Sequence, residues 1–276
     1  MGKYKISVVT VCFNAEKEIE NTILSVVDQT YDDIEYLVID GGSSDGTVDI
    51  IKKYVDGGSE AMRHRHHITY WVSEPDKGIY DAMNKGIIKA TGDYINFMNA
   101  GDSFYNDDVI EKVVNKIEQD TIIVYGQLIK KYNRFEFIAC PQAIDLDMMK
   151  NSARLPHQSM FACAPYIKDH KFSLSYKSAS DFKFYYEAHF QDKCKFQYIP
   201  FIIANYDSEK GMSKDSYIGP LESLKIQGKK ISTLERRKLI IKYKLINLLK
   251  KYLPESIITK IRINKFSKQG YEIMPK

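Results

Sequence analysis

The chain has 276 residues, which is enough to bury a large core in one large domain or two small ones. Its net charge of +4 conceals an asymmetry, because residues 225–276 carry 15 Lys or Arg against 3 acids, whereas residues 1–224 carry 25 against 33. An acidic body argues against a nucleic-acid channel, and it implies that an anionic nucleotide held there needs a cation.

Strands and helices are predicted to alternate in the first half of the chain. Apolar runs of strand length predict buried strands at 6–12, 34–39, 68–72 and 94–98, the first of them rich in β-branched residues. Apolar residues at helical spacing predict the intervening helices, at 19–27, 48–54, 79–87 and 107–117. This alternation with short connections predicts an α/β fold with a mostly parallel sheet flanked by helices.

The pattern loosens after a predicted strand at 122–125. Antiparallel strands are predicted within 128–137, a short helix near 144–150 and a further strand at 158–162. We therefore expect a mixed extension of the same sheet. Because no Pro/Gly/Ser-rich linker separates the halves, residues 1–224 are interpreted as one domain with halves at 1–110 and 111–224.

Residues 225–276 are predicted to form a basic helical tail. Its main helix is expected at 234–253, with one apolar face made by Leu234, Ile241, Leu245, Leu248, Leu249 and Tyr252. Basic residues gather on the other face, although Lys238 and Lys242 intrude into the apolar stripe. Such a helix could lie on an anionic membrane surface through 229–253, or pack on the body or on another subunit.

Cysteine usage and the lengths of apolar runs indicate an intracellular protein. Cys12, Cys140, Cys163 and Cys194 lack any CxxC pairing, so neither a disulfide framework nor a zinc site is suggested. No apolar run approaches the ~18–20 residues that a signal anchor or membrane span requires. We expect a cytoplasmic location, at the inner face of the plasma membrane if the tail binds lipid.

Four polar clusters follow the first four predicted strands, at 10–14, 40–47, 73–78 and 99–102. Ligands of open parallel sheets bind beyond the carboxyl ends of the strands, so these clusters should converge on one nucleotide site. A carboxylate at the tip of a buried strand, as at Asp40, needs a hydrogen-bond partner such as a base or a ribose. Asp45 and Thr47 are better explained as caps of the following helix.

The sequence contains neither the GxGxxG dinucleotide fingerprint nor the GxxxxGK[ST] phosphate loop, which argues against nicotinamide oxidoreductases and phosphate-loop ATPases. A nucleotide diphosphate held by carboxylates would be neutralised by a divalent metal, Mn²⁺ or Mg²⁺. Asp102 is the candidate ligand and Asn99 shapes its turn, although Asn99 to Asp102 could also be only a turn.

These clusters together resemble family 2 glycosyltransferases. The similarity lies in Thr10-Val-Cys-Phe-Asn14, in the run from Tyr36 to Thr47, in Ser73 to Gly86, in Ala90-Thr-Gly-Asp93 and in Phe97 to Asp102. It is highly specific over residues 5–110 and weaker to about residue 213. The resemblance implies the A-type glycosyltransferase fold and inverting transfer from a nucleotide-sugar, with 1–110 as the nucleotide-sugar-binding half and 111–224 as the acceptor side. Within the family, the sequences of these motifs are similar to those of bacterial enzymes that build capsule, O-antigen and exopolysaccharide.

The resemblance also implies roles for individual residues of the donor site. The nucleotide would contact residues from three clusters: Thr10, Phe13, Asn14, Asp40, Asp76, Lys77 and Gly78. Asn99, Ala100 and Gly101 would lie near the donor sugar or diphosphate, and Asp102 would bind the metal. At both turns many relatives have two acids, whereas in this chain the residue beside Asp40 is Gly41 and the residue beside Asp102 is Gly101. This difference puts the contact with the nucleobase and the affinity for a metal in question. Asp81 and Asn84 could line the sugar pocket or face solvent.

An inverting displacement needs one general base for the acceptor hydroxyl. Asp181, in Ser178-Ala-Ser-Asp-Phe182, matches the family's base, although an Asp in a first helical turn is favoured whatever its role. His157 resembles a motif residue near the acceptor and diphosphate, or is a hydrogen-bonded core residue. Lys210, in Ser208 to Ser213, would meet the diphosphate if that segment closes over the donor.

Two other functions remain open from the sequence. A nucleotidyltransferase that makes sugar nucleotides could share the sheet, but it normally has a glycine-rich N-terminal loop with Arg and Lys where this chain has Thr10 to Asn14. A non-catalytic nucleotide-sugar-binding scaffold of the same fold is the other. For the transferase, the expected partners are a nucleotide-sugar donor and a glycan or polyprenyl-linked glycan acceptor.

Overall fold

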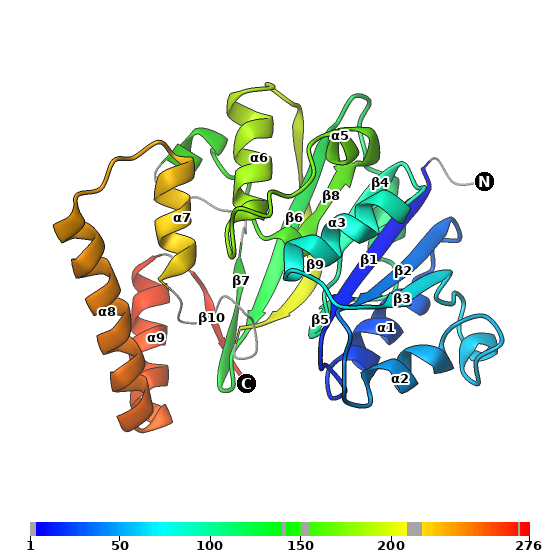
Figure 1. The fold of residues 1–276 in the computed structure, drawn as a ribbon, viewed down its shortest axis with the longest axis horizontal. Helices are drawn as coiled ribbons and strands as arrows, with labels where there is room; N and C mark the ends of the chain where they lie inside the picture. Colours follow the sequence, from blue (N-terminus) through cyan, green and yellow to red (C-terminus); the bar gives the residue numbers. More distant parts are fainter. Residues whose placement is uncertain (1–3, 140–141, 151–154, 209–216, 270) are drawn as a thin grey trace.

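The computed structural model describes residues 4–139, 142–150, 155–208, 217–269 and 271–276. It contains one mixed ten-stranded sheet with helices on both faces and a helical segment at one side (Figure 1). The strand order is β10-β7-β6-β8-β4-β1-β2-β3, and β9 pairs with both β6 and β5. The predicted α/β fold class is confirmed.

The first half forms the parallel part of the sheet. Its strands are β1 (Ile6–Cys12), β2 (Ile34–Asp40), β3 (Tyr70–Ser73) and β4 (Tyr94–Phe97). Its helices are α1 (Ile19–Val27), α2 (Thr47–Lys53), the 3-10 turn η1 (Ala61–Arg63) and α3 (Ile79–Lys89). β1 pairs in parallel with both β2 and β4, and β2 pairs in parallel with β3. The alternation predicted from the sequence therefore holds in this half.

The second half adds mostly antiparallel strands. They are β5 (Asp102–Phe104), β6 (Ile123–Lys131), β7 (Phe135–Ala139), β8 (Met160–Cys163) and β9 (Phe196–Asp207). The helical elements are α4 (Val109–Val114), η2 (Leu146–Lys150), η3 (His157–Ser159), α5 (Ala164–Asp169) and α6 (Ser180–Phe190). β8 lies between β4 and β6 and runs antiparallel to both, so it joins the two halves into one sheet.

Alternating side chains of the central strands supply two hydrophobic layers. Ile6, Val8 and Tyr36 pack with α1, α2 and α4 on one face, whereas Val9 and Leu37 pack with α3, α5 and α6 on the other. All of β1 is buried, as expected of a central parallel strand that is covered on both faces. The strand ends are thereby held rigidly, and the polar turns that follow them are fixed in space.

The tail consists of α7 (Ile218–Ile226), α8 (Thr233–Tyr252), α9 (Glu255–Lys268) and β10 (Ile273–Pro275). α9 packs on the body through Phe266, whose ring centroid lies 4.6 Å from that of Phe137 and 5.8 Å from that of Tyr132. β10 then pairs antiparallel with β7. Neither α9 nor β10 was predicted from the sequence, and the boundary placed at residue 224 falls inside α7.

Candidate active site

The four polar clusters converge on one edge of the sheet, here called the strand-end surface. Cys12 at the end of β1 is paired with Asp40, and Asp40 is paired with Ser73 at the end of β3. The turn after β4 joins them because the Ala100 N–H donates to the Val11 carbonyl over 3.1 Å. Residues from strands far apart in sequence are thus neighbours at this edge.

Asp40 is fully buried, and its carboxylate organises the turn that follows β2. Oδ2 accepts hydrogen bonds from the backbone N–H groups of Gly42 and Ser43, at 3.1 and 2.9 Å, and from the Ser73 hydroxyl at 2.6 Å. Oδ1 accepts from the Ser43 hydroxyl. The hydrogen-bond partners that this strand-tip carboxylate needs are therefore supplied by the protein itself.

The predicted nucleotide contacts of the first cluster differ in accessibility. Thr10 is fully buried, and its hydroxyl donates to the Met98 carbonyl over 2.7 Å, so that side chain belongs to the core. Phe13 is 63% exposed and stands at the strand-end surface. Asn14 has a positive φ of 47°, and its Oδ1 accepts from the Ser44 N–H over 2.9 Å. Of these three side chains, Phe13 is the most available to a ligand.

Gly41 lies directly between Phe13 and Asp76. A Cβ added at Gly41 would stand 2.5 Å from Asp76 Oδ2 and 3.4 Å from the Phe13 ring. The glycine that replaces the second acid of many relatives therefore leaves room for Asp76 to approach. Asp76 Oδ1 in turn accepts from the N–H of Gly78, whose φ of +116° favours glycine. We call Phe13, Gly41 and Asp76 the aromatic–acid slot.

The start of α3 is fixed by polar contacts that involve two predicted sugar-pocket residues. The Lys77 N–H donates to Asp81 Oδ2 over 3.0 Å, so this carboxylate closes the turn before the helix. Both polar atoms of the Asn84 side chain bond the backbone of Phe172, at 2.8 and 2.9 Å. Asn84 therefore ties α3 to the segment after α5, whereas Asp81 lies in the first turn of α3.

At the start of α2, Asp45 accepts from the Thr47 N–H over 3.0 Å and from the Thr47 hydroxyl. The N-cap of α2 is Gly46, which makes no side-chain cap hydrogen bond, and the Thr47 hydroxyl accepts from the Ala15 N–H over 2.8 Å, so neither Asp45 nor Thr47 is the N-cap that the sequence suggested.

The turn from Asn99 to Asp102 is held from α1. The Thr22 hydroxyl donates to the Asp102 carbonyl over 2.7 Å and accepts from the Gly101 N–H over 3.0 Å. Gly101 has a φ of +97°, a conformation that L side chains rarely adopt. The backbone conformation at Gly101 therefore explains why no second acid stands here, because an aspartate at this φ would be strained.

The Asp102 carboxylate has an unusual environment. The residue is 7% exposed, and burial raises its pKa from 3.8 to about 7, with the nearby charge of Asp207 acting in the same direction. The charge of His157 and a hydrogen bond from Gln158 oppose this rise. A carboxylate that is costly to ionise in a buried position is stabilised by a bound cation.

Asp181, in the first turn of α6, lies in a chain of polar contacts that reaches the turn after β4. Its Oδ1 accepts from the Tyr80 hydroxyl over 2.9 Å, and its Oδ2 lies 3.3 Å from His157 Nδ1. His157 Nε2 lies 3.3 Å from the Asn99 amide nitrogen. Residues from α3, α6, η3 and the β4 turn therefore meet at one place.

The Asp181 and His157 pKa values shift in opposite directions. Burial acts to raise the pKa of Asp181, but hydrogen bonding to His157 and its positive charge, together with the Phe182 N–H and the Tyr80 hydroxyl, outweigh it and lower the pKa. Burial acts to lower the pKa of His157, yet hydrogen bonding to Asp181 and the charges of Asp181 and Asp102 raise it. Both shifts stabilise the ionised Asp181 carboxylate with the Nδ1–H of His157 directed at it.

Tyr80 and Thr22 are site residues that were not predicted from the sequence. Tyr80 meets Asp181 across 101 positions of sequence, and Thr22 meets Asp102 across 80, so no local pattern could have identified them. Lys210 lies outside the described residues.

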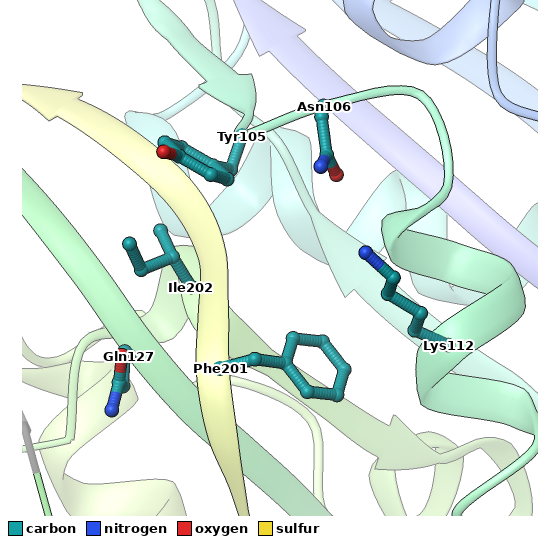
Figure 2. Close-up of a pocket in the computed structure, with 6 residues that line it drawn as sticks. All are labelled: Tyr105, Asn106, Lys112, Gln127, Phe201 and Ile202. Atoms are coloured by element: carbon teal, nitrogen blue, oxygen red, sulfur yellow. The ribbon is translucent and has the colours of Figure 1, made fainter.

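Figure 2 shows a hollow of about 250 Å³ that contains none of the predicted site residues. Side chains from the connection after β5 and from α4, β6 and β9 line it: Tyr105, Asn106, Lys112, Gln127, Phe201 and Ile202. The predicted site residues at the strand-end surface are therefore not part of the lining of this hollow.

The family model for glycosyl transferase family 2 matches residues 7–184, which span the strand ends and both residues of the Asp181–His157 pair. The chain belongs to glycosyl transferase family 2. The family resemblance stated from the motifs is thereby confirmed.

Curated relatives of this family 2 glycosyltransferase include mycobacterial proteins. A "PGL/p-HBAD biosynthesis glycosyltransferase" of Mycobacterium bovis is 28% identical over 223 residues, covering 77% of this chain and 80% of the relative. An "uncharacterized glycosyltransferase" of Mycobacterium tuberculosis is 40% identical over 113 residues, covering 41% of this chain and 39% of the relative. The stronger identity is thus confined to less than half of the chain.

Solved structures share the fold of this glycosyltransferase. S. aureus TarS 1-349 in complex with UDP-GlcNAc has a TM-score of 0.62 at 16% identity, covering 87% of this chain and 71% of that one. A mannosyltransferase from Pyrobaculum calidifontis in complex with GDP-Man and Mn²⁺ has a TM-score of 0.60 at 17% identity, covering 81% and 63%. In a longer TarS chain the match spans 42% of the length. At these identities the similarity concerns the fold.

Proposed function

We propose that this glycosyltransferase is metal-assisted and inverting, and that it moves a sugar from a nucleotide-sugar to a glycan or lipid-linked glycan in bacterial surface polysaccharide biosynthesis. The observation that carries the proposal is that two carboxylates with opposite pKa shifts lie near one imidazole, that of His157. Asp181 is kept ionised by His157 and Tyr80, whereas Asp102 is buried and costly to ionise. Asp181 is therefore present in the ionised form that can accept a proton, and the buried Asp102 carboxylate is stabilised by a bound cation.

In the proposed reaction, Asp181 takes the proton of the acceptor hydroxyl. The acceptor oxygen forms its bond to the anomeric carbon while the bond from that carbon to the diphosphate oxygen breaks, and the configuration inverts. His157 holds the Asp181 carboxylate through Nδ1, and Tyr80 holds its other oxygen. Burial and the charge of Asp181 raise the pKa of Tyr80, so the phenol stays a donor. The base is thereby oriented from two sides.

A divalent cation fits the residues beside Asp102. The donor set is the buried Asp102 carboxylate and the Asn99 amide oxygen, which is buried and has no hydrogen-bond partner. Among the described residues no group of three or more His, Cys, Asp or Glu could hold a metal ion. Mg²⁺ and Mn²⁺ often take one or two protein carboxylates and complete their shell with phosphates and water. A bound cation would neutralise the leaving diphosphate.

Three features of similar proteins support the donor assignment. TarS binds UDP-GlcNAc in one solved structure, and the Pyrobaculum mannosyltransferase binds GDP-Man together with Mn²⁺ in another. The mycobacterial relative carries a biosynthetic glycosyltransferase name. We extend from these to a nucleotide-sugar donor and a divalent cation for this chain.

The aromatic–acid slot is proposed to receive the nucleobase. Phe13 offers an exposed ring face for stacking, and Asp76 offers a carboxylate that can accept a hydrogen bond from a base N–H. Gly41 forms the floor between them. Asp40 then acts indirectly, because it fixes the turn that carries Gly41 and Ser43.

Gly41→Ala is expected to weaken nucleotide binding by roughly tenfold or more, because its Cβ must displace the Asp76 carboxylate. The fold should survive, since Asp76 Oδ2 is the end of a flexible side chain. Isothermal titration with UDP and GDP measures the affinity, and thermal unfolding measures the stability. Gly57→Ala is the control for affinity, because a Cβ there meets nothing within 4 Å, whereas its φ of +75° means that the alanine lowers stability without touching the slot. Unchanged affinity in Gly41→Ala would remove the slot from the donor site.

The proposed function is tested by a thermal-shift screen of UDP-, GDP- and dTDP-sugars with and without Mn²⁺, followed by detection of released nucleoside diphosphate. We expect at least one donor to stabilise the protein in a Mn²⁺-dependent way and to be hydrolysed slowly without acceptor. Pyrophosphate formed from a sugar phosphate and a nucleoside triphosphate would instead indicate a nucleotidyltransferase. Binding without any turnover, with candidate acceptors present, would indicate a scaffold.

We further propose a cytoplasmic protein that works at the inner face of the plasma membrane, where a lipid-linked acceptor is presented. Among the described residues, no helix is both long and apolar enough to span a bilayer. The support for a membrane surface comes from the basic tail, with 15 Lys or Arg against 3 acids in residues 225–276.

A further inference from the structure

α8 has an apolar face that nothing in the described chain covers. The helix has no buried residue, and six large apolar side chains on it are more than half exposed: Leu234, Ile241, Leu245, Leu248, Leu249 and Tyr252. At 100° per residue these six fall within an arc of about 100°. We call this arc the outer face of α8.

A second set of apolar residues points in another direction and explains why the outer face is free. Leu239, Ile240, Tyr243 and Ile246 are half-buried, and their positions on the helix lie roughly opposite the outer face. Figure 1 shows α8 at the outer edge of the molecule, beyond α7 and α9. The helix thus packs through one apolar stripe and exposes the other. Packing on the rest of the molecule and contact with an external partner can therefore occur at the same time.

The charges of α8 show what kind of partner fits the outer face. α8 carries seven Lys or Arg residues and one acid, Glu235. Glu235 is occupied at the helix start, where its carboxylate accepts from the Ser232 N–H and hydroxyl, each over 2.8 Å. Its pKa is lowered by these bonds, so the capping box retains its acid in charged form. The remaining charge of the helix is uniformly positive.

Basic residues border the outer face on both sides. Arg237, Lys244 and Lys251 lie along one border, Lys242 lies along the other, and Lys238 lies within the face, between Leu245 and Leu249. Long Lys stems can lie along an apolar surface while their ammonium groups reach polar headgroups. This is the distribution of an interfacial helix that lies in the plane of an anionic bilayer.

We propose that the outer face of α8 docks on an anionic lipid surface. A second copy fits less well, because a symmetric contact through the outer faces of two α8 helices would bring together the five basic residues in or beside each face. The acidic body, with 25 Lys or Arg against 33 acids in residues 1–224, is repelled by the same lipid surface. Attraction of the tail and repulsion of the body together orient the molecule on the membrane. The proposal is independent of the donor and of the transfer chemistry.

Co-sedimentation of the full chain with vesicles tests the proposal. We expect binding to phosphatidylglycerol-containing vesicles, little binding to pure phosphatidylcholine vesicles, and a loss of binding in high salt. Leu245→Glu combined with Leu248→Glu should weaken binding by about tenfold or more, since both side chains are 53% exposed on the outer face. Lys238→Glu combined with Lys242→Glu should weaken it by a similar factor.

Leu174→Glu is the control, because Leu174 is 52% exposed but lies in the body, before α6. Donor hydrolysis in lipid-free solution should be unchanged in all of these variants, which separates this test from that of the proposed function. Equal binding of the Leu245→Glu/Leu248→Glu variant and the parent chain would overturn the proposal. So would a lipid-free dimer that the same variant dissociates, combined with no affinity of the parent chain for anionic vesicles.

Discussion

Asp181→Asn should reduce sugar transfer by roughly 10²–10⁴-fold, the usual contribution of a positioned general base. The amide keeps the shape of the carboxylate but cannot accept the proton of the acceptor hydroxyl. Nucleotide-sugar affinity should change by no more than about twofold, because the contacts of Asp181 are with Tyr80 and His157. Initial rates with acceptor, measured beside donor affinity by titration calorimetry, check both parts.

The chain contains a matched control for this substitution. Asp192 accepts from the Tyr166 hydroxyl over 2.6 Å and lies 3.5 Å from His170 Nε2, so it repeats the Tyr–Asp–His arrangement beyond the other end of α6. Roughly 16 Å of helix separates the two ends. Asp192→Asn should leave transfer intact. If both variants lose activity equally, or if Asp181→Asn abolishes donor binding, Asp181 has a structural role.

A second readout follows from the coupling of Asp181 to His157. The hydrogen bond and the charge of Asp181 raise the pKa of His157, so Asp181→Asn should lower it. Histidine side-chain NMR follows this titration directly. A His157 pKa that does not move would mean that the two side chains are not in contact in solution.

Asp102→Asn should abolish the stabilisation of the protein by Mn²⁺ and yet make the metal-free protein more stable at pH 8. Burial raises the pKa of Asp102 from 3.8 to about 7, so folding favours the protonated acid. That contribution is fully present below pH 3.8 and is lost as the pH rises through about 7. At pH 8 the parent chain therefore carries a buried, ionised carboxylate that the variant lacks, a difference on the order of 2–4 kcal/mol.

Thermal unfolding at pH 5 and pH 8, with and without Mn²⁺, separates the two effects. The gain of the metal-free variant should be several degrees at pH 8 and should shrink at pH 5, where Asp102 of the parent chain is protonated. Asp192→Asn again serves as the control and should show neither effect. A variant that is less stable than the parent at pH 8, or that keeps its response to Mn²⁺, would contradict the assignment of Asp102.

The nucleotide half of the fold was predictable because its signals are local. The apolar runs of β1, β2 and β4 and the polar residues at their ends lie within short windows, and parallel pairing brings those ends together. The hydrogen bond from the Thr47 N–H to Asp45 is local in the same way, since the two residues are two positions apart.

Contacts between distant segments were not predictable in this way. Thr10 has the residue type and position of a ligand contact, but Met98, 88 positions away, takes up its hydroxyl in the core. Tyr80 and Thr22 carry no local signal, because their partners lie on other elements. α9 was missed because its apolar residues are interleaved with Lys and Arg, and because its main contact, Phe266, packs on Tyr132 and Phe137 far upstream.

The pairing of β10 with β7 has a consequence for how the chain reaches its native state. Ile273 pairs with Phe137, so β7 is synthesised long before the strand that covers its edge. During that interval the aromatic residues of β7 border open hydrogen-bonding groups, the situation that invites pairing with another chain. The contact also closes a very long loop, which slows its formation. Expression at low temperature or with a chaperone should therefore improve the yield of soluble protein more than any change at the strand-end surface.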